Sequence, residues 1–244
     1  MKSQDSTKPK LAEKQNAKLE ITPAELARYI DHTLLKAGSV TSQFEKLCDD
    51  AIKYNFYSVC VNSGWVEFVA KRLKGKGINI CSVVGFPLGE METSSKAFEA
   101  KCAIEKGANE IDMVIKVGAL KDRELKIVEE DIRAVKEVCR EKAILKVIIE
   151  TCLLTEEEKI LACEISKKAD ADFVKTSTGF STGGATVEDI VLMRKVVGPK
   201  MGVKASGGIS EYNKAVALIN AGASRLGCGA SIAIITGATA QGNY

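Results

Sequence analysis

The chain has 244 residues, of which 45% are hydrophobic and 27% are charged, and its formal net charge is +3. This composition is ordinary for a globular protein with a large core. The small net charge gives no support to a nucleic-acid partner, and the apolar segments are too short for a transmembrane helix.

Three further features limit the possible functions. Residues 1–20 are rich in lysine, glutamine and serine and lack the apolar stretch of a secretory signal, so we interpret them as a flexible leader to one domain over 21–244. The eight cysteines form no C-x-x-C pair, which favours a reducing, cytoplasmic location. The single histidine, His32, argues against a catalytic zinc site, so we expect neither a metal nor a cofactor.

From Thr22-Pro23-Ala24-Glu25, a helix start with a capping box, short β-branched segments alternate with amphipathic ones along the chain. The predicted strands are 29–34, 58–61, 78–86, 110–115, 144–149, 172–176, 202–205 and 224–226. The predicted helices begin near residues 41, 65, 93, 123, 155, 186, 210 and 231. Eight strand–helix units with short connections favour an α/β fold, a single-domain (β/α)8 TIM barrel, over a doubly wound open sheet. No G-x-G-x-x-G follows the first strand, which removes the main support for a dinucleotide-binding fold.

Four charged residues lie inside otherwise apolar predicted strands: Asp112, Lys146, Lys175 and Lys204. Apart from Thr176, which follows Lys175, their neighbours along each strand are apolar, so period-two alternation places the charged side chains on the opposite face, toward the barrel interior. Each one alone is compatible with a structural ion pair. Together, three lysines and one aspartate predict an active site at the carboxyl ends of the strands.

Such a cluster suits amine catalysis. Burial and neighbouring ammonium groups favour the neutral form of one lysine, which can then form a Schiff base with a carbonyl substrate. The aspartate would transfer protons. These arguments do not rank Lys175 above Lys146 or Lys204.

Glycine-rich loops follow the last three strands, as Thr178-Gly179, Ser206-Gly207-Gly208 and Gly229-Ala230-Ser231. In this fold such loops often hold a phosphate through backbone N–H groups, although tight turns also require glycine. The combined features indicate a Schiff-base lyase acting on a phosphorylated sugar or aldehyde.

Five stretches resemble the deoxyribose-phosphate aldolase family, in this order along the chain: Ile30-Asp31-His32-Thr33-Leu34-Leu35-Lys36, Glu110-Ile111-Asp112-Met113-Val114, Leu145-Lys146-Val147-Ile148-Ile149-Glu150-Thr151, Phe173-Val174-Lys175-Thr176-Ser177-Thr178-Gly179 and Val203-Lys204-Ala205-Ser206-Gly207-Gly208-Ile209. The resemblance implies a metal-independent class I aldolase that reversibly splits 2-deoxy-D-ribose 5-phosphate into acetaldehyde and D-glyceraldehyde 3-phosphate, in deoxyribonucleotide catabolism. It also implies a homodimer or homotetramer.

The resemblance makes Lys175 the Schiff-base lysine, with Lys204 favouring its neutral form and relaying protons. Asp112 is the implied proton donor and acceptor, working through a water. Lys146, Cys60 and Asp31 are implied supporting residues, with Cys60 lining the acetaldehyde side unless it is simply a packed strand cysteine.

The implied phosphate-binding residues lie in the three glycine-rich loops: Thr178, Gly179, Gly207, Gly208, Gly229, Ala230 and Ser231. The family usually has a pair of serines after the eighth strand, where this chain has Gly229-Ala230, so backbone N–H groups would make most phosphate contacts there. In the family that the chain resembles, a C-terminal tyrosine can reach toward the site, and Tyr244 is the corresponding residue here.

Other classes of function also remain open. A transaldolase or keto-acid sugar aldolase shares the lysine chemistry but does not explain Lys204 paired with Asp112. A phosphate-binding isomerase or synthase would need a carboxylate or histidine base and would tolerate loss of Lys175. A non-catalytic binding protein leaves the strand charges without a purpose.

Overall fold

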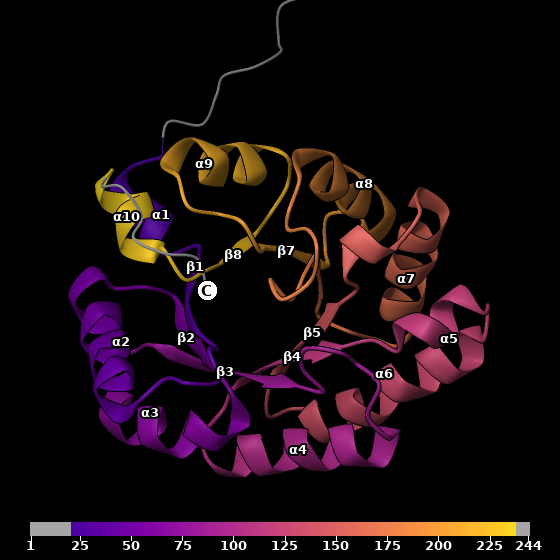
Figure 1. The fold of residues 1–244 in the computed structure, drawn as a ribbon, viewed down its shortest axis with the longest axis horizontal. Helices are drawn as coiled ribbons and strands as arrows, with labels where there is room; N and C mark the ends of the chain where they lie inside the picture. Colours follow the sequence, from indigo (N-terminus) through magenta and orange to yellow (C-terminus); the bar gives the residue numbers. More distant parts are fainter. Residues whose placement is uncertain (1–20, 238–244) are drawn as a thin grey trace, which may run out of the picture.

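The computed structural model describes residues 21–237, which form a closed barrel of eight parallel strands surrounded by helices (Figure 1). The strands are neighbours in chain order from β1 to β8, and β8 closes the barrel by pairing with β1. The fold is the (β/α)8 barrel that the alternating pattern predicts. The expected leader over 1–20 and the expected role of Tyr244 concern residues outside this described range.

All eight predicted strands are present, within a few residues of the expected limits. The strands are β1 (Ile30–Leu34), β2 (Ser58–Val61), β3 (Asn79–Val84), β4 (Glu110–Val114), β5 (Ile144–Ile148), β6 (Phe173–Lys175), β7 (Gly202–Ser206) and β8 (Arg225–Cys228). The α-helices are α1 (Pro23–Ala27), α2 (Thr41–Tyr54), α3 (Val66–Leu73), α4 (Thr93–Glu105), α5 (Val117–Lys121), α6 (Leu125–Cys139), α7 (Glu156–Lys168), α8 (Val187–Val197), α9 (Tyr212–Asn220) and α10 (Ser231–Thr236). Two 3₁₀ turns, η1 (Ser63–Trp65) and η2 (Thr151–Leu153), precede α3 and α7.

Helix starts follow the capping chemistry in the sequence. The hydroxyl of Thr22 accepts from the N–H of Glu25 at the start of α1, and Glu25 reaches back to Thr22. The same reciprocal pair forms between Thr155 and Glu158 at the start of α7. Each box satisfies donors that the first helical turn leaves unpaired, so it fixes where the helix begins.

Two details differ from the sequence-based expectations. The helix α5 is absent from the predicted elements, because five residues are too few to display an amphipathic period. The helix α9 begins at Tyr212 rather than near Ser210, since Glu211 is still extended with φ −131°.

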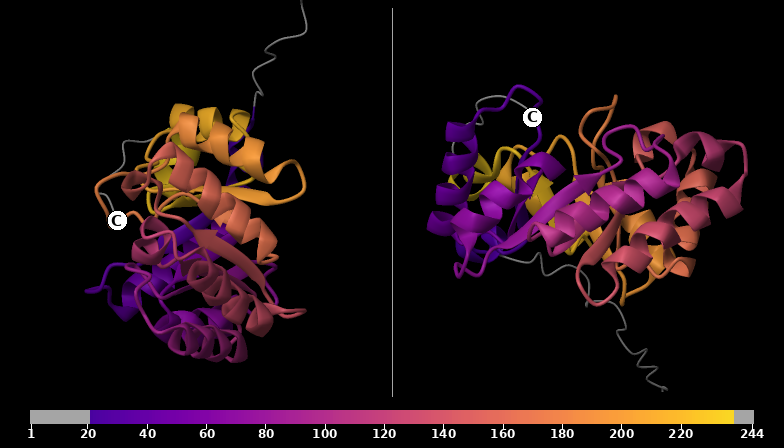
Figure 2. Two further views of the ribbon diagram at one scale, coloured as in Figure 1. Left: turned by 90° about the vertical axis from the view of Figure 1, so that its right-hand side faces the viewer. Right: turned by 90° about the horizontal axis from the view of Figure 1, so that it is seen from below.

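The barrel separates an apolar layer from a polar interior. Side chains that point outward from the strands, such as Val59, Val147 and Val203, pack with the helices in one large hydrophobic core. Figure 2 shows this ring of helices around the strands from two further sides. The alternate residues point into the lumen, where the charged groups meet. Among residues 21–237, the model contains no helix with the length and apolarity needed to cross a membrane.

Candidate active site

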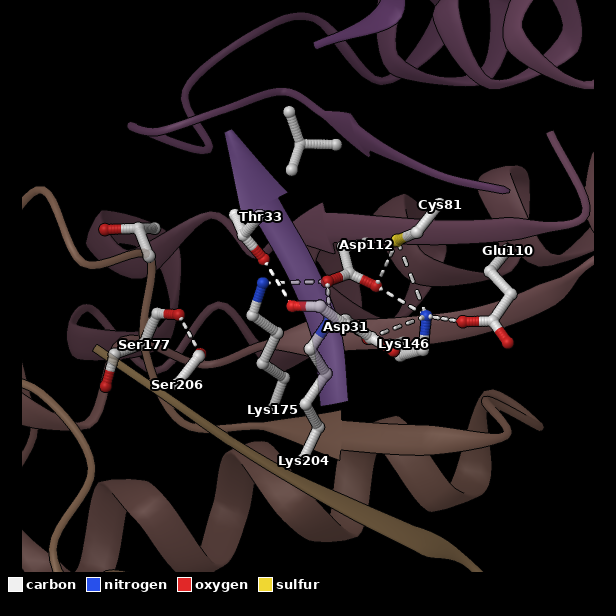
Figure 3. Close-up of polar contacts among 12 residues, drawn as sticks. Asp31, Thr33, Cys81, Glu110, Asp112, Lys146, Lys175, Ser177, Lys204 and Ser206 are labelled. Carbon is white, nitrogen blue, oxygen red and sulfur yellow. Dashed lines mark hydrogen bonds and ion pairs between the residues drawn. The ribbon is translucent and has the colours of Figure 1, made fainter. Parts of the chain in front are cut away.

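The charged strand residues meet in the barrel lumen around the carboxylate of Asp112 on β4. The Nζ atoms of Lys175 and Lys204 each lie 2.7 Å from its Oδ2 atom (Figure 3). On the other side, Nζ of Lys146 lies 2.9 Å from Oδ1. The structure therefore brings together the four strand charges that period-two alternation places on one face. These four residues come from four consecutive strands, β4 to β7.

Deeper in the lumen, Asp31 of β1 and Glu110 of β4 continue the network. Asp31 pairs with the ammonium of Lys204, and Glu110 Oε2 lies 2.5 Å from Nζ of Lys146. Arg225 of β8 joins both carboxylates, at 2.9 Å from Asp31 Oδ1 and 3.0 Å from Glu110 Oε2. Sequence reasoning missed Glu110 and Arg225. Glu110 lies two residues before Asp112 and hence on the same strand face, so the alternation that selected Asp112 also contained this signal.

This network holds one more cation than carboxylates. Its members are Asp31, Glu110 and Asp112 on the acidic side, and Lys146, Lys175, Lys204 and Arg225 on the basic side. Loss of one proton from one lysine leaves the seven groups with balanced charge, which matters because buried unpaired charge is expensive. Lys175 has Asp112 as its one ion-pair partner among the described residues, whereas Lys146 and Lys204 each have at least two.

Position also distinguishes the three lysines. Lys146 and Lys204 are fully buried, whereas Lys175 retains 3% exposure at the last residue of β6. Ligands in this fold approach from the carboxyl ends of the strands. Lys175 is thus the most accessible of the three lumen lysines, at the end of the barrel from which ligands approach.

The electrostatic environment keeps the surrounding groups ionised. Burial would raise the pKa of Asp112, but Lys146, Lys175 and Lys204 outweigh it and hold that pKa well below its usual range. Burial would lower the pKa of Lys204, but the carboxylates of Asp112 and Asp31 hold it well above the usual value. The same reasoning applies to Lys146, whose pKa is raised mainly by Asp112 against the effect of burial. Lys204 therefore stays a cation beside the amine of Lys175.

A glycine on β8 makes room for this arrangement. A Cβ atom on Gly227 would lie 3.0 Å from Cβ of Ser206 and 3.1 Å from Cε of Lys204. Any side chain at this position would push the Lys204 stem away from Asp112. Glycine is required here by the close approach of a neighbouring side chain.

The loop after β6 is held by Glu150, which follows β5. Glu150 adopts a left-handed backbone conformation with φ 55°, and its carboxylate accepts from both the N–H and the hydroxyl of Thr178. The Ser206 hydroxyl donates to the Ser177 carbonyl at 2.5 Å, which ties the same loop to β7. Glu150 was not singled out by sequence reasoning, because its partner is 28 residues away in another loop.

The glycine-rich loops after β6 and β7 pack backbone to backbone. A Cβ on Gly184 would lie 2.3 Å from the carbonyl oxygen of Gly207, and Gly207 itself has φ 83°. Gly179 and Gly208 also have positive φ, at 85° and 66°. These conformations are open to glycine and costly for other residues.

Two predicted phosphate contacts have their hydroxyls engaged within the protein. The Thr178 hydroxyl donates to Glu150, as described above. The Ser231 hydroxyl donates to the carbonyl of Cys228 and lies 2.9 Å from Nδ1 of His32. At Ser231, a phosphate contact would therefore come from the backbone N–H. The phosphate-binding roles stay predictions.

The lumen also has an apolar side. Leu35, Cys60, Cys81, Val83 and Phe86 form a cluster separate from the main core, which we call the apolar wall. Cys60 is 1% exposed within it. Phe86 also meets Phe180 of the β6–α8 loop edge to face, with ring centroids 5.2 Å apart.

One cluster in the described range has metal-ligand chemistry. The Sγ atoms of Cys60 and Cys81 and one carboxylate oxygen of Asp112 all lie within 4.8 Å of one another. However, the ammonium of Lys146 lies 3.5 Å from Sγ of Cys81 and 2.9 Å from Asp112. A cation in that position opposes a bound metal ion, so we assign no metal to this cluster.

Comparisons with known proteins agree with this geometry. A family model described as DeoC/LacD family aldolase matches residues 26–236. The chain is 59% identical over 219 residues to the deoxyribose-phosphate aldolase of Streptococcus gordonii, covering 90% of this chain and 99% of that protein. It is 58% identical over 220 residues to the deoxyribose-phosphate aldolase of Clostridium perfringens, covering 90% and 98%. A tetrameric deoxyribose phosphate aldolase from Aeropyrum pernix has a similar structure, with a TM-score of 0.83 at 30% identity over 88% of this chain and 91% of that chain.

Proposed function

The chain belongs to the deoxyribose-phosphate aldolases of the DeoC/LacD family, and from that premise we propose that Lys175 carries its Schiff-base chemistry. The reaction is the reversible cleavage of 2-deoxy-D-ribose 5-phosphate into D-glyceraldehyde 3-phosphate and acetaldehyde. A lysine Schiff base serves this cleavage because the iminium ion accepts the electron pair of the broken C–C bond.

In the cleavage direction, the neutral amine of Lys175 adds to the C1 aldehyde of the open-chain substrate, and water leaves to give the iminium ion. A base removes the proton of the C3 hydroxyl, the C2–C3 bond breaks, and glyceraldehyde 3-phosphate departs. The enamine left on Lys175 takes a proton at C2, and hydrolysis of the resulting iminium ion releases acetaldehyde and restores the amine. This chemistry requires no cofactor.

The observation that carries the assignment is the position of Lys175 at the end of β6, with Asp112 as its one ion-pair partner among the described residues and with Lys204 sharing that carboxylate at the same 2.7 Å. Asp112 thereby lies one hydrogen bond from the reacting nitrogen and Lys204 lies two, through Asp112, so both can move protons to and from the intermediates. Asp31 and Lys146 act as supporting residues, because each holds a member of this group in place. The apolar wall, including Cys60, offers the surface for the methyl group of acetaldehyde.

The phosphate group is proposed to bind at the loops after β6, β7 and β8, which contain Gly179, Gly207, Gly208, Gly229 and Ala230. Backbone N–H groups in such loops are the usual phosphate ligands of this fold. Gly207→Ala should raise KM for 2-deoxyribose 5-phosphate about ten-fold or more, without the same effect on unphosphorylated 2-deoxyribose. Gly198→Ala is a matched control, because Gly198 has φ 76° and no neighbouring atom within 4 Å of the added Cβ. An equal effect on both substrates would remove Gly207 from the phosphate site.

Borohydride trapping tests the nucleophile. The protein is incubated with 2-deoxyribose 5-phosphate and borohydride, and the adduct is located by peptide mass spectrometry, in parallel with Lys175→Ala and Lys204→Ala. We expect a reduced adduct on Lys175, absent from the first variant. An adduct on Lys204 or Lys146 would overturn the roles assigned here, and the absence of any adduct and of glyceraldehyde 3-phosphate would refute the Schiff-base proposal.

Two wider expectations accompany this function. All eight cysteines are free thiols, which supports a reducing, cytoplasmic location. A homodimer or homotetramer is the proposed assembly, and light scattering coupled to size-exclusion chromatography measures its mass directly.

A further inference from the structure

Two cysteines of the apolar wall lie opposite each other on neighbouring strands. Cys60 of β2 pairs in register with Cys81 of β3. Both point into the lumen, since Val59 and Val61 on either side of Cys60 belong to the outer core. Adjacent strands are about 4.7–4.9 Å apart, which lies inside the roughly 4.4–6.8 Å range of Cα separations that disulfides span. The backbone thus holds this pair at bonding range without a rearrangement of the barrel.

The two sulfur atoms also lie close to the proposed proton-transfer group. The Sγ atoms of both cysteines and one oxygen of Asp112 lie within 4.8 Å of one another. The Cys81 thiol donates to Oδ1 of Asp112 at 3.1 Å, and Lys146 lies 3.5 Å from the same sulfur (Figure 3). Any chemical change at Cys81 therefore alters a hydrogen bond to Asp112.

The environments of the two thiols differ in a way that assigns them separate roles. When Cys60 is a thiolate, the single S–H group of Cys81 can turn from Asp112 and donate to Cys60, and this hydrogen bond, helped by Lys204, lowers the pKa of Cys60 against the effect of burial. Burial, together with the hydrogen bond to Cys60, raises the pKa of Cys81 well above its usual value. Thiolates are the reactive form, so Cys60 is the nucleophile of the pair. By contrast, burial raises the pKa of Cys139 and Cys163 to about 12, which makes them inert.

We propose that Cys60 and Cys81 form a peroxide-sensitive dithiol that closes to a disulfide inside the barrel and reversibly switches off the enzyme. The oxidant is a small hydroperoxide such as hydrogen peroxide, comparable in size to acetaldehyde and able to use the same lumen.

The proposed reaction has two balanced steps. The Cys60 thiolate attacks one peroxide oxygen, the O–O bond breaks, and Cys60 becomes a sulfenic acid while hydroxide leaves and takes up a proton as water. The Cys81 sulfur then attacks the Cys60 sulfur, the S–O bond breaks, and the hydroxyl leaves as water with the thiol proton of Cys81. In total, two thiols and one hydrogen peroxide give one disulfide and two waters, and a dithiol reductant reverses the bond.

The disulfide removes the thiol donor that Cys81 supplies to Asp112. A hydrogen bond to a charged group contributes enough that its loss should lower kcat/KM by roughly ten-fold or more. This loss of activity rests on the proposed role of Asp112, whereas formation of the disulfide does not.

The test uses the full chain carrying Cys102→Ser and Cys152→Ser, which removes the two cysteines that are not fully buried. This background is treated with hydrogen peroxide, remaining thiols are alkylated, and peptides are mapped without reduction. Activity is measured before oxidation, after oxidation and after dithiothreitol. We expect a linked Cys60–Cys81 peptide, a loss of activity that parallels its yield, and recovery on reduction.

Two variants on that background separate the roles, each compared with its own untreated sample. Cys81→Ser keeps a hydroxyl donor near Asp112 but cannot form the disulfide, so it should accumulate a dimedone-reactive sulfenic acid on Cys60. Cys60→Ala should keep its full starting activity through the same peroxide treatment. The proposal is overturned if the linked peptide is absent, if the linked protein keeps its activity, or if Cys60→Ala is inactivated as fast as the background. A protein without activity before oxidation would refute the proposed function, while the peptide map still reports on the disulfide.

Discussion

Two buried lysine–aspartate pairs in this barrel differ in how many other charged groups contact them. Between the helices, Lys96 of α4 contacts Asp131 of α6 at 2.6 Å, and both side chains are fully buried. In the lumen, Lys175 contacts Asp112 at 2.7 Å, with similar burial. The two pairs have nearly the same distance and differ little in exposure, so their main difference lies in what surrounds them.

The pair between the helices has all its hydrogen-bonding groups occupied by neighbours within the protein. Lys96 also donates to the carbonyl of Val114, and Thr93 donates to the other oxygen of Asp131. One amine meets one carboxylate, and the stem of Lys96 packs on Gly85, where a Cβ would lie 2.9 Å from Cε. Asp112, in contrast, is shared by three lysines, and Lys175 lies at the strand end. A buried lysine with its own carboxylate stabilises the fold. Where three lysines share one carboxylate, one of the amines is left able to react.

The largest effect is expected from Lys175→Met, which should lower kcat by about 10⁴-fold or more because the nucleophile is lost. The melting temperature should not fall, since the change removes the surplus cation of the lumen. Steady-state kinetics and thermal unfolding on the same preparation measure both. A strongly destabilised variant would place Lys175 in the same class as Lys96.

Lys96→Met is the reciprocal change. Removing one partner of a buried pair leaves Asp131 uncompensated and should reduce the free energy of unfolding by about 3–5 kcal/mol. Denaturant titration measures this loss. Turnover per folded molecule, determined by active-site trapping with borohydride, should stay near that of the parent; a thousand-fold fall in that quantity would contradict a purely structural role.

His32 tests burial without a close charged partner, because its Nδ1 lies 2.9 Å from the hydroxyl of Ser231 and its Nε2 lies 4.0 Å from Asp50. Burial lowers the pKa of His32 to about 4, although Asp50 opposes the shift. Between pH 6.5 and pH 4, the imidazole of His32 is protonated in the unfolded chain but stays largely neutral in the folded chain. Stability should therefore fall by about 3 kcal/mol between pH 6.5 and pH 4 from this group. The unfolding free energy of His32→Gln should depend less steeply on pH across that interval, and an unchanged slope would exclude His32 as the cause.

The smallest effect is expected at an exposed pair with the same short distance. Lys71 and Glu67 lie 2.5 Å apart on α3, but their side chains are 75% and 55% exposed. Exposed pairs of this kind contribute little, because water solvates both partners. Lys71→Ala should leave the melting temperature and kcat unchanged within error. A measurable loss in either would show that proximity alone, without burial, accounts for the effects at Lys96 and Lys175.

Periodicity could predict the lumen cluster because strand alternation is a local property. Asp112, Lys146 and Lys204 each lie between apolar neighbours, Lys175 follows the apolar Val174, and that pattern predicted the shared face that the structure has. Glu110 follows the polar Asn109, so only its position two residues before Asp112, on the same strand face, could have indicated it. Ranking Lys175 above the other lysines needed the family resemblance. The three lysines occur in similar strand patterns, so the pattern alone does not indicate which of them is the nucleophile.

The pair between the helices could not be predicted in this way. Lys96 and Asp131 both lie on helices, where charged residues are usually exposed. Their burial depends on how α4 packs against α6, and the two residues are 35 positions apart. The sequence around a helical lysine does not indicate whether a distant carboxylate will pair with it, so this pair can be identified only from the tertiary structure.

The closing contact between β1 and β8 also bears on how the enzyme is made. Asp31 depends on Arg225, which follows it by 194 positions in the chain. Until the last strand emerges during synthesis, closing the other strands around Asp31 would bury this acid without its guanidinium partner, which opposes early closure. Non-local pairings of this kind also slow folding. Completion of the barrel and assembly of the lumen charges are therefore one late event, and a chain that stops short of β8 is expected to remain open, without an active site.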